Sequence, residues 1–181
     1  MFLVFTSFLK YIMIHFQRFE AIDFDRLKSW ITSEKELIQF AGPIFTFPLT
    51  DDQLEKYCTS NKREVFKIVL DETSEVIGHC EFNYENELPR ISRVLIGDEK
   101  VRNRGIGTEI VRKMSVELFK NSEISKIDLN VFAWNDRAIH CYEKLGFRIN
   151  ATTVFGQPIE GEMWENHNMV LLRDDFVLNQ R

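Results

Sequence analysis

Hydrophobic and polar residues alternate along the chain in two periods, one typical of strands and one typical of helices. Residues His15 to Phe19 alternate one by one and predict an opening strand. Asp23 can then cap a helix, whose apolar residues recur at helical spacing: Leu27, Trp30 and Ile31. Glu34 to Phe40 has the same period, and polar residues at 50–53 predict the start of a third helix that ends near residue 59.

The middle of the chain has the two-residue period of strands. Two runs, Glu64 to Leu70 and Glu75 to Tyr84, flank a polar turn at residues 71–74 and predict a hairpin. A third run, Ile91 to Ile96, follows closely and ends before a glycine-containing turn. The pattern therefore predicts three consecutive strands in the centre of the chain.

After this glycine-containing turn, helix patterns and strand patterns alternate along the chain. Apolar residues of the first helix fall on one face: Ile106, Ile110, Val111, Met114 and Leu118. Ser125 to Val131 predicts a strand, and a helix capped by Asn135 and ended by Gly146 follows it. Two further strands are predicted at Phe147 to Phe155 and at Met163 to Leu172.

Length and composition fit one domain. A chain of 181 residues can bury about 70% of the surface of its unfolded state. No repeat, linker or low-complexity segment divides it. We expect one domain of the α/β class, which some schemes call α+β, over residues 13–174. Residues 1–12 form an apolar N-terminal extension, either packed as an extra helix or loosely ordered, and residues 175–181 form a C-terminal tail.

The net charge of the chain limits its binding partners, and its cysteines indicate the cellular compartment. The net charge of −5 argues against nucleic-acid binding, which favours a basic surface, and is compatible with cationic substrates. The apolar N-terminal extension is too short to span a membrane. Three cysteines without metal-ligand spacing suggest a reducing cytosol. We expect a cytoplasmic protein with no nucleic-acid partner, no membrane partner and no metal; a homodimer remains open.

The turn after the third central strand is the first candidate site. Two arginines, Arg102 and Arg104, precede Gly105 and Gly107 at the start of a helix. Unpaired N–H groups and the helix dipole make such an N-terminus attractive to anions, and glycine lets the backbone approach them closely. The alternative is an ordinary tight strand-to-helix connection. The turn lacks the Gly-Lys-Ser/Thr of the P-loop and the three glycines of the dinucleotide fingerprint.

A second motif supplies the context. Some thirty residues after the R-x-x-G-x-G turn, the chain has the pattern N-x-x-A-x-x-x-Y-x-K-x-G-F from Asn135 to Phe147. Together, in this order and at this spacing, the two motifs closely resemble the GNAT superfamily of acetyl-CoA-dependent N-acetyltransferases, over roughly residues 14–173. Trp30, Gly42-Pro43 and the segment Phe47 to Thr50 resemble the branch that contains ribosomal-protein N-terminal acetyltransferases and related small-molecule enzymes.

The resemblance implies a fold and a set of cofactor contacts. The fold would be a mixed, strongly twisted sheet of six to seven strands flanked by helices. The pyrophosphate of acetyl-CoA would lie on the turn, and the pantetheine arm along a strand that splays from its neighbour; Gly97 departs from the family, which more often has a β-branched residue there. The implied cofactor-binding residues are Leu95, Ile96, Gly97, Arg102, Asn103, Arg104, Gly105, Ile106, Gly107, Thr108, Asn135, Ala138 and Tyr142.

The resemblance also implies the catalytic roles. Tyr142 would lie near the thioester sulfur, where a phenol can protonate the departing thiolate; the alternative is a core aromatic residue. For Asn135 the alternative is a simple helix cap. Glu81 is the first candidate for a base that acts through water, and His79 shares its face of the strand. The strand face that carries Glu81 and His79 either belongs to the active site or is merely exposed to solvent.

These observations predict a function. We expect an N-acetyltransferase that moves an acetyl group from acetyl-CoA to a primary amine by direct attack in a ternary complex. The acceptor would be a protein N-terminus or a small amine such as a polyamine or an aminoglycoside. Three glutamates near the last hairpin either line an amine pocket or form a solvated turn: Glu160, Glu162 and Glu165. The alternative function is a non-catalytic module that binds or senses acyl-CoA.

Overall fold

The computed structural model describes residues 13–102, 104–154 and 158–178. The predicted N-terminal extension, residues 1–12, lies outside the described residues. Seven strands form one mixed sheet in the order β1-β2-β3-β4-β5-β7-β6. The strands are β1 (Ile14–Arg18), β2 (Arg63–Leu70), β3 (Val76–Asn83), β4 (Arg90–Ile96), β5 (Lys126–Phe132), β6 (Arg148–Val154) and β7 (Glu165–Leu172). This confirms the predicted mixed sheet, and each predicted strand lies within two residues of an observed one.

The helices begin where the sequence supplies caps. The Thr50 hydroxyl accepts a hydrogen bond from Gln53 N–H, and Asn135 accepts one from Ala138 N–H. Ser33 and Glu36 form a reciprocal capping box. The α-helices are α1 (Phe24–Ser29), α2 (Glu34–Ala41), α3 (Asp51–Cys58), α4 (Ile106–Phe119), α5 (Asp136–Glu143) and α6 (Arg173–Leu178), and the short 3-10 helices are η1 (Ala21–Asp23), η2 (Gly42–Ile44) and η3 (Glu99–Val101).

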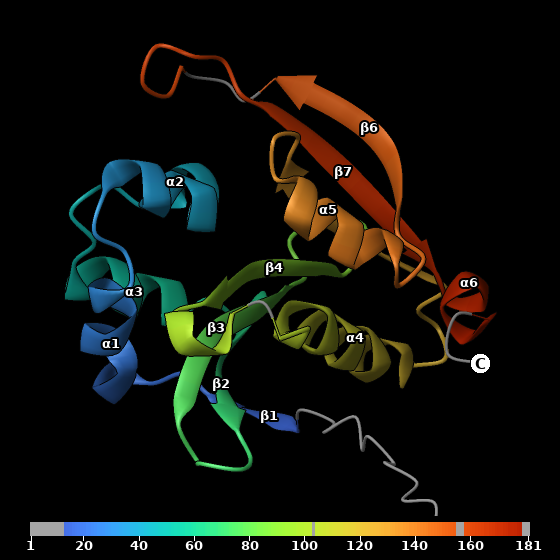
Figure 1. The fold of residues 1–181 in the computed structure, drawn as a ribbon, viewed down its shortest axis with the longest axis horizontal. Coiled ribbons are helices and arrows are strands. Elements are labelled where there is room, and N and C mark those ends of the chain that lie inside the picture. Colours follow the sequence, from blue (N-terminus) through green and yellow to red (C-terminus); the bar gives the residue numbers. More distant parts are fainter. Residues whose placement is uncertain (1–12, 103, 155–157, 179–181) are drawn as a thin grey trace, which may run out of the picture.

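The helices cover the sheet unequally. Figure 1 shows α1, α2 and α3 gathered beside the β1–β4 half, whereas α5 and α6 lie beside the strands of the other half. The larger core cluster joins α4, α5 and α6 to one face of the sheet, and includes Ile110, Met114 and Phe147. A second cluster joins α1 to α3 to the opposite face, and includes Leu27 and Leu54. The two faces of the β1–β4 half are therefore both buried.

The C-terminal end of the fold differs from the prediction. Residues 175–181 are predicted as a tail, but α6 continues to Leu178. Phe176 is buried and its ring lies 5.6 Å from the ring of Phe119. The Arg173 guanidinium donates to backbone carbonyls at the end of α4 and in the following turn, those of Phe119, Asn121 and Ile124. These contacts make α6 part of the domain.

One junction in the sheet positions everything that follows. All neighbouring strands pair antiparallel except β4 and β5, which are parallel. They pair at only two positions, Arg90 with Asp128 and Ile91 with Leu129. Beyond Ile91 the two strands separate, so the inner edge of β4 has no strand partner. Backbone N–H and C=O groups on such an edge are free to bind a ligand.

Candidate active site

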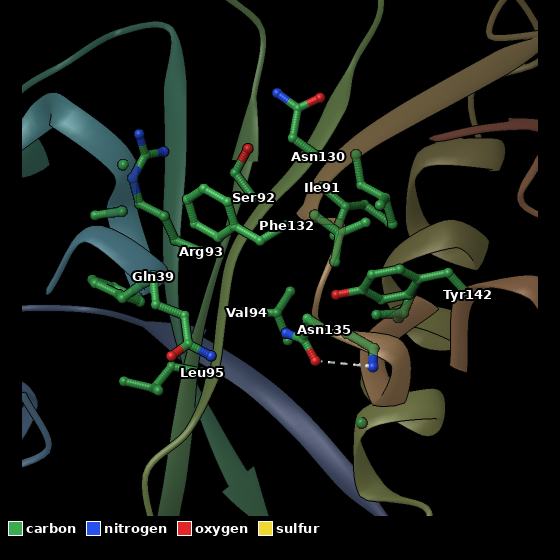
Figure 2. Close-up of a pocket in the computed structure, with 18 of the residues that line it drawn as sticks. Gln39, Ile91, Ser92, Arg93, Val94, Leu95, Asn130, Phe132, Asn135 and Tyr142 are labelled. Atoms are coloured by element: carbon green, nitrogen blue, oxygen red, sulfur yellow. Dashed lines mark hydrogen bonds between the residues drawn. The ribbon is translucent and has the colours of Figure 1, made fainter. Parts of the chain in front are cut away.

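A cavity of about 960 Å³ lies where β4 and β5 separate. Its walls come from α2, β4, β5 and the N-terminal turns of α4 and α5. Figure 2 shows Gln39, Arg93 and Leu95 on one side of it and Asn135 and Tyr142 on the other. The cavity thus extends from the glycine turn to the first half of the chain.

A β-bulge in β4 shapes this opening. His79 pairs with Leu95 and Glu81 pairs with Ser92, so one β3 residue faces two residues of β4. Arg93 lies in the bulge with φ +50°, in the left-handed region. A non-glycine residue there costs of the order of 1–3 kcal/mol and persists only where its surroundings hold it. The bulge bends β4 at the point where it leaves β5.

The glycine turn forms the cofactor end of the cavity. Gly105 is the N-cap residue of α4 and has φ +80°, which explains the choice of glycine. A Cβ atom on Gly105 would meet nothing within 4 Å, so the space in front of the helix is open. Gly105, Ile106, Gly107 and Thr108 line the cavity. This open helix N-terminus fits a diphosphate.

The two arginines of this turn differ in their surroundings. Arg102 donates through Nε and Nη2 to the Ile96 carbonyl at 3.1 and 3.0 Å, and through Nη1 to Glu99. The Arg102 side chain therefore binds the backbone at the end of β4 instead of extending freely toward a phosphate. Arg104 is exposed, and Asn103 lies outside the described residues. Arg137, at the start of α5, adds a cation to the cavity wall that the sequence analysis did not identify.

The end of β4 is shaped by a tryptophan. Leu95 and Ile96 line the cavity, as does Trp30. Gly97 packs so closely against the Trp30 ring that an added Cβ would lie 1.9 Å from it. The departure from a β-branched residue at position 97 therefore makes room for an aromatic ring. Gly97 N–H also donates to the Ile77 carbonyl at 2.9 Å, which keeps this strand end attached to β3.

The second motif lies across the opening. Asn135 caps α5 by accepting from Ala138 N–H at 3.2 Å, and both residues also line the cavity. The two interpretations of Asn135, cap and site residue, are compatible. Tyr142 extends from α5 with its hydroxyl directed toward β4 (Figure 2). Burial raises the pKa of Tyr142 to about 12, so this phenol stays protonated at neutral pH and can donate.

Glu81 is placed differently from a base in contact with substrate. Its side chain is fully buried and does not line the cavity. Both carboxylate oxygens accept from Arg93 Nη1, at 2.5 and 2.6 Å, and Oε2 also accepts from the Tyr57 hydroxyl at 2.5 Å. Arg93 itself lines the cavity. Glu81 is therefore separated from the cavity by the arginines that it contacts, Arg93 and, at 4.0 Å, Arg63.

His79 lies beside this pair on the same face, which is neither solvent nor cavity surface. Its ring is fully buried among Phe19, Phe40 and Tyr57. Nδ1 donates to the Arg93 carbonyl at 3.1 Å and Nε2 has no partner in the described part of the chain. Burial lowers the pKa of His79 to about 4. A neutral His79 thus holds the backbone of the bulge.

Of the glutamates near the last hairpin, Glu160 has a structural contact. It accepts from Lys35 of α2 at 2.6 Å, which joins α2 to the turn between β6 and β7. Nearby, Ile38 of α2 packs against a small cluster that contains Phe132 and Trp164. All three glutamates are exposed and do not line the cavity. These contacts join α2 to the β6–β7 turn beside the cavity wall formed by Ile38 and Phe132.

Several cavity residues were not found from the sequence. These residues lie outside the two motifs, and only the fold brings the elements that carry them together. They include Trp30, Gln39, Arg63, Ser92, Arg93, Val94, Asn130, Phe132 and Asn166. Polar and charged residues inside the short strand β4 were the one available signal, because a central strand is usually apolar.

The fold matches solved acetyltransferases. The structure of spermidine N-acetyltransferase from Vibrio cholerae with CoA and spermine has a TM-score of 0.75 at 18% identity, covering 91% of this chain and 98% of that one. The aminoglycoside acetyltransferase AAC(6')-Ib in complex with coenzyme A has a TM-score of 0.72 at 22% identity, covering 93% and 100%. These likenesses confirm the predicted fold.

Sequence comparison gives the family. The model of the acetyltransferase (GNAT) family matches residues 25–147, and the chain belongs to this family. The aminoglycoside N(6')-acetyltransferase type 1 of Klebsiella pneumoniae is 38% identical over 58 residues, which span 32% of this chain and 29% of the relative. The L-amino acid N-acetyltransferase AaaT of Escherichia coli (strain K12) is 28% identical over 110 residues, 58% and 67% of the two chains.

These findings confirm the predicted superfamily and the acetyltransferase class of enzyme. They do not specifically support the ribosomal-protein branch, because the matched proteins are named for aminoglycosides, amino acids and spermidine. Within the described residues, no helix combines the length and apolarity needed to cross a membrane. The same residues contain no group of three or more side chains arranged to hold a metal ion.

The packing of Trp30 on Gly97 predicts a strong effect of adding a side chain at position 97. Gly97→Val should lower the melting temperature by several degrees, because the new side chain overlaps the indole ring and overpacking typically costs about 1–3 kcal/mol. Gly107→Ala is the control: its Cβ would be 3.7 Å from the nearest atom, so stability should hold or rise. Thermal unfolding checks both. Equal melting temperatures for wild type and Gly97→Val would contradict the proposed contact.

Buried His79 predicts loss of stability in acid. The unfolded chain takes up a proton below pH 6.5 whereas native His79 resists protonation down to about pH 4. The free energy of unfolding should therefore fall across this window by up to about 3 kcal/mol, at about 1.36 kcal/mol per pH unit. Urea titrations at several pH values measure this slope. It should flatten in His79→Phe and persist in His140→Gln, whose histidine is exposed; an unchanged slope in His79→Phe contradicts the assignment.

Proposed function

We propose that this protein is an acetyl-CoA-dependent N-acetyltransferase that acetylates a primary amine of a small molecule by direct attack in a ternary complex. The observation that carries the proposal is the separation of β4 from β5 after Ile91. This opening is faced by the Tyr142 hydroxyl and leads to the glycine turn at α4. One continuous cavity thus offers a place for a thioester, an acid and a diphosphate.

The donor, acetyl-CoA, would lie along the inner edge of β4. The N–H groups at the start of α4, from Gly105 to Thr108, would receive its pyrophosphate. Arg104, which precedes Gly105 in the chain, and Arg137, which lines the cavity, would add positive charge. The pantetheine arm would lie along the backbone edge of β4 at Leu95 and Ile96, as a peptide adds to a sheet edge. The Ile96 carbonyl already accepts from Arg102, so the arm would use the other backbone groups of this edge. The Asn135 side-chain amide would meet the arm from α5.

Two groups are positioned for the chemistry. When the neutral amine attacks the thioester carbonyl, negative charge develops on its oxygen, and a backbone N–H of β4 just after the bulge can stabilise it. The C–S bond then breaks and the thiolate leaves. Tyr142, whose pKa burial raises to about 12 so that the phenol is protonated beforehand, can give this sulfur a proton. The nitrogen loses a proton as the amide forms, and this proton restores the phenol through solvent. Acetyl transfer is direct, and we assign no covalent intermediate to a cysteine.

The connection between α2 and the β6–β7 turn favours a small acceptor over a protein N-terminus. The Lys35–Glu160 ion pair and the packing of Ile38 on Phe132 and Trp164 join α2 to the β6–β7 turn. A polypeptide would have to pass this bridge, whereas a small amine needs only the cavity. We assign Glu81 a positioning role through Arg93 in place of direct proton abstraction.

Replacing the phenol tests the acid. Tyr142→Phe should lower turnover by about 10²-fold, because general acid catalysis typically contributes 10²–10⁴. The affinity for acetyl-CoA should change little, since the ring is kept. Thiol release across an amine panel, with calorimetric titration of acetyl-CoA, measures both. A full rate in Tyr142→Phe removes Tyr142 from the chemistry, and binding without turnover on every amine would favour the acyl-CoA-binding module.

Replacing the turn glycine tests the diphosphate site. Gly105→Val should weaken CoA binding at least tenfold, because its side chain enters the space in front of α4. Gly161→Val is a matched control: Gly161 also has positive φ, +84°, and open space around its Cβ, but lies in the turn between β6 and β7. Both variants strain the backbone and only Gly105→Val should lose affinity. Retained CoA affinity in Gly105→Val contradicts the site.

A further inference from the structure

The acceptor half of the cavity contains three arginines. Arg63, Arg90 and Arg93 line it. Two of their carboxylate partners, Glu81 and Asp128, are buried behind them and do not line the cavity. At Arg90 and Arg93 a molecule in the cavity therefore meets guanidinium groups, whereas Arg63 is paired with Glu85, which also lines the cavity. This arrangement suits an anionic group on the acceptor.

Arg93 has unused hydrogen-bonding capacity. Only 9% of its side chain is exposed, and it donates to Glu81 through Nη1 alone. Its Nε is buried without a hydrogen-bond partner among the described residues; the Nε of Arg63 also lacks a hydrogen-bond partner there, although it lies 4.0 Å from Glu81 Oε1. A buried donor without a partner costs about 1–3 kcal/mol. A carboxylate from a ligand would relieve this cost and accept from more than one nitrogen.

The guanidinium of Arg93 is also held in place before any ligand arrives. Glu81 anchors it and is itself anchored by the Tyr57 hydroxyl at 2.5 Å. The guanidinium carbon of Arg93 lies 5.6 Å from the centre of the Tyr57 ring, and that of Arg63 lies 5.7 Å from it. His79 holds the Arg93 carbonyl. Such preorganisation reduces the entropy lost on binding.

The rest of the acceptor half is poorly suited to a polycation. Glu36 and Glu85 are the carboxylates that line it within the described residues. Glu36 already accepts from the backbone of Thr32 and Ser33, and Glu85 accepts from Arg63. Several ammonium groups would therefore face guanidinium groups with few free carboxylates.

Part of the wall of the acceptor half is apolar. Ile38, Phe40 and Ile44 line the cavity from α2 and the turn that follows it, and Phe132 lines it from β5. An acceptor that fits both walls has an apolar body as well as its anionic group. The side chain of a hydrophobic amino acid has this character.

We infer that the acceptor is an amine with a nearby carboxylate, of the class of apolar α-amino acids, and that Arg93 receives the carboxylate. This inference rests on the proposed function. Val94 directly follows Arg93 in β4. An amine held through its carboxylate at Arg93 would therefore face the thioester just beyond the bulge. The apolar side chain would lie against α2. Arg93 is then a specificity-determining residue for the reaction.

Amines that differ only in charge test the inference. L-Phenylalanine, L-phenylalaninamide and spermidine are compared as acceptors by thiol release from acetyl-CoA. We expect kcat/KM for phenylalanine to exceed that for its amide at least tenfold, with spermidine lower still. Calorimetric titration of the same three compounds into the CoA complex measures binding without turnover.

Variants locate the effect. Arg93→Met combined with Glu81→Gln removes both buried charges together, so neither is left unpaired. This double variant should raise KM for phenylalanine at least tenfold and abolish the preference for phenylalanine over its amide, because only phenylalanine has the carboxylate that Arg93 receives. Arg93→Lys keeps the charge and tests the guanidinium geometry, with an expected intermediate loss. Arg148→Met, at an exposed arginine of β6, should behave as wild type.

Three results would overturn the inference: equal use of phenylalanine and its amide, preference for spermidine, or an equal loss on both phenylalanine compounds in the double variant that melts like wild type. Failure of the proposed function is distinguishable. If no amine releases thiol, the binding preference for the carboxylate in the CoA complex still decides the inference, and its absence overturns it. If the double variant does not fold, Arg93→Lys and the wild-type comparison decide it.

Discussion

The parting of β4 from β5 is the constraint on which the site depends. Two registered pairs, at Arg90 and Ile91, hold the parallel strands together, and the bulge at Arg93 then bends β4 away. A fully paired sheet would have no cavity here, because every backbone group of β4 would bond to a neighbouring strand. The opening exposes an edge in the middle of a sheet, and α4 and α5 place their N-terminal turns beside it.

The bulge in turn depends on buried polar groups on the other face of the sheet. Glu81, Tyr57 and His79 hold the side chain and the carbonyl of Arg93. A buried ion pair is weak evidence for stability in general, because desolvation offsets much of its attraction. Here its position suggests a different use: it maintains a backbone conformation that Arg93 would rarely adopt alone. The core beneath α1 to α3 is thereby coupled to the geometry of the site.

The sequence predicted the elements well because period and caps are local properties. Asn135 predicted the start of α5, and Gly105 predicted the turn before α4. The extent of α6 was not predicted, since six residues provide too little period, and its place depends on the contact of Phe176 with Phe119. The role of Arg102 was also beyond sequence reasoning: a motif shows that an arginine is present, and the carbonyl it bonds to is known only from the fold.

The sequence by itself determined the family and the order of strands and helices, and it predicted the cofactor half of the site, because both motifs are contiguous and each carries its own backbone geometry. Only the tertiary structure decided the acceptor half. Its walls come from α2, β2, β4 and β5, which are distant along the chain, and pairing in the sheet brings them together. It also turned Glu81 from a candidate base into the buried partner of Arg93, since burial and ion pairing depend on neighbours that no local pattern contains.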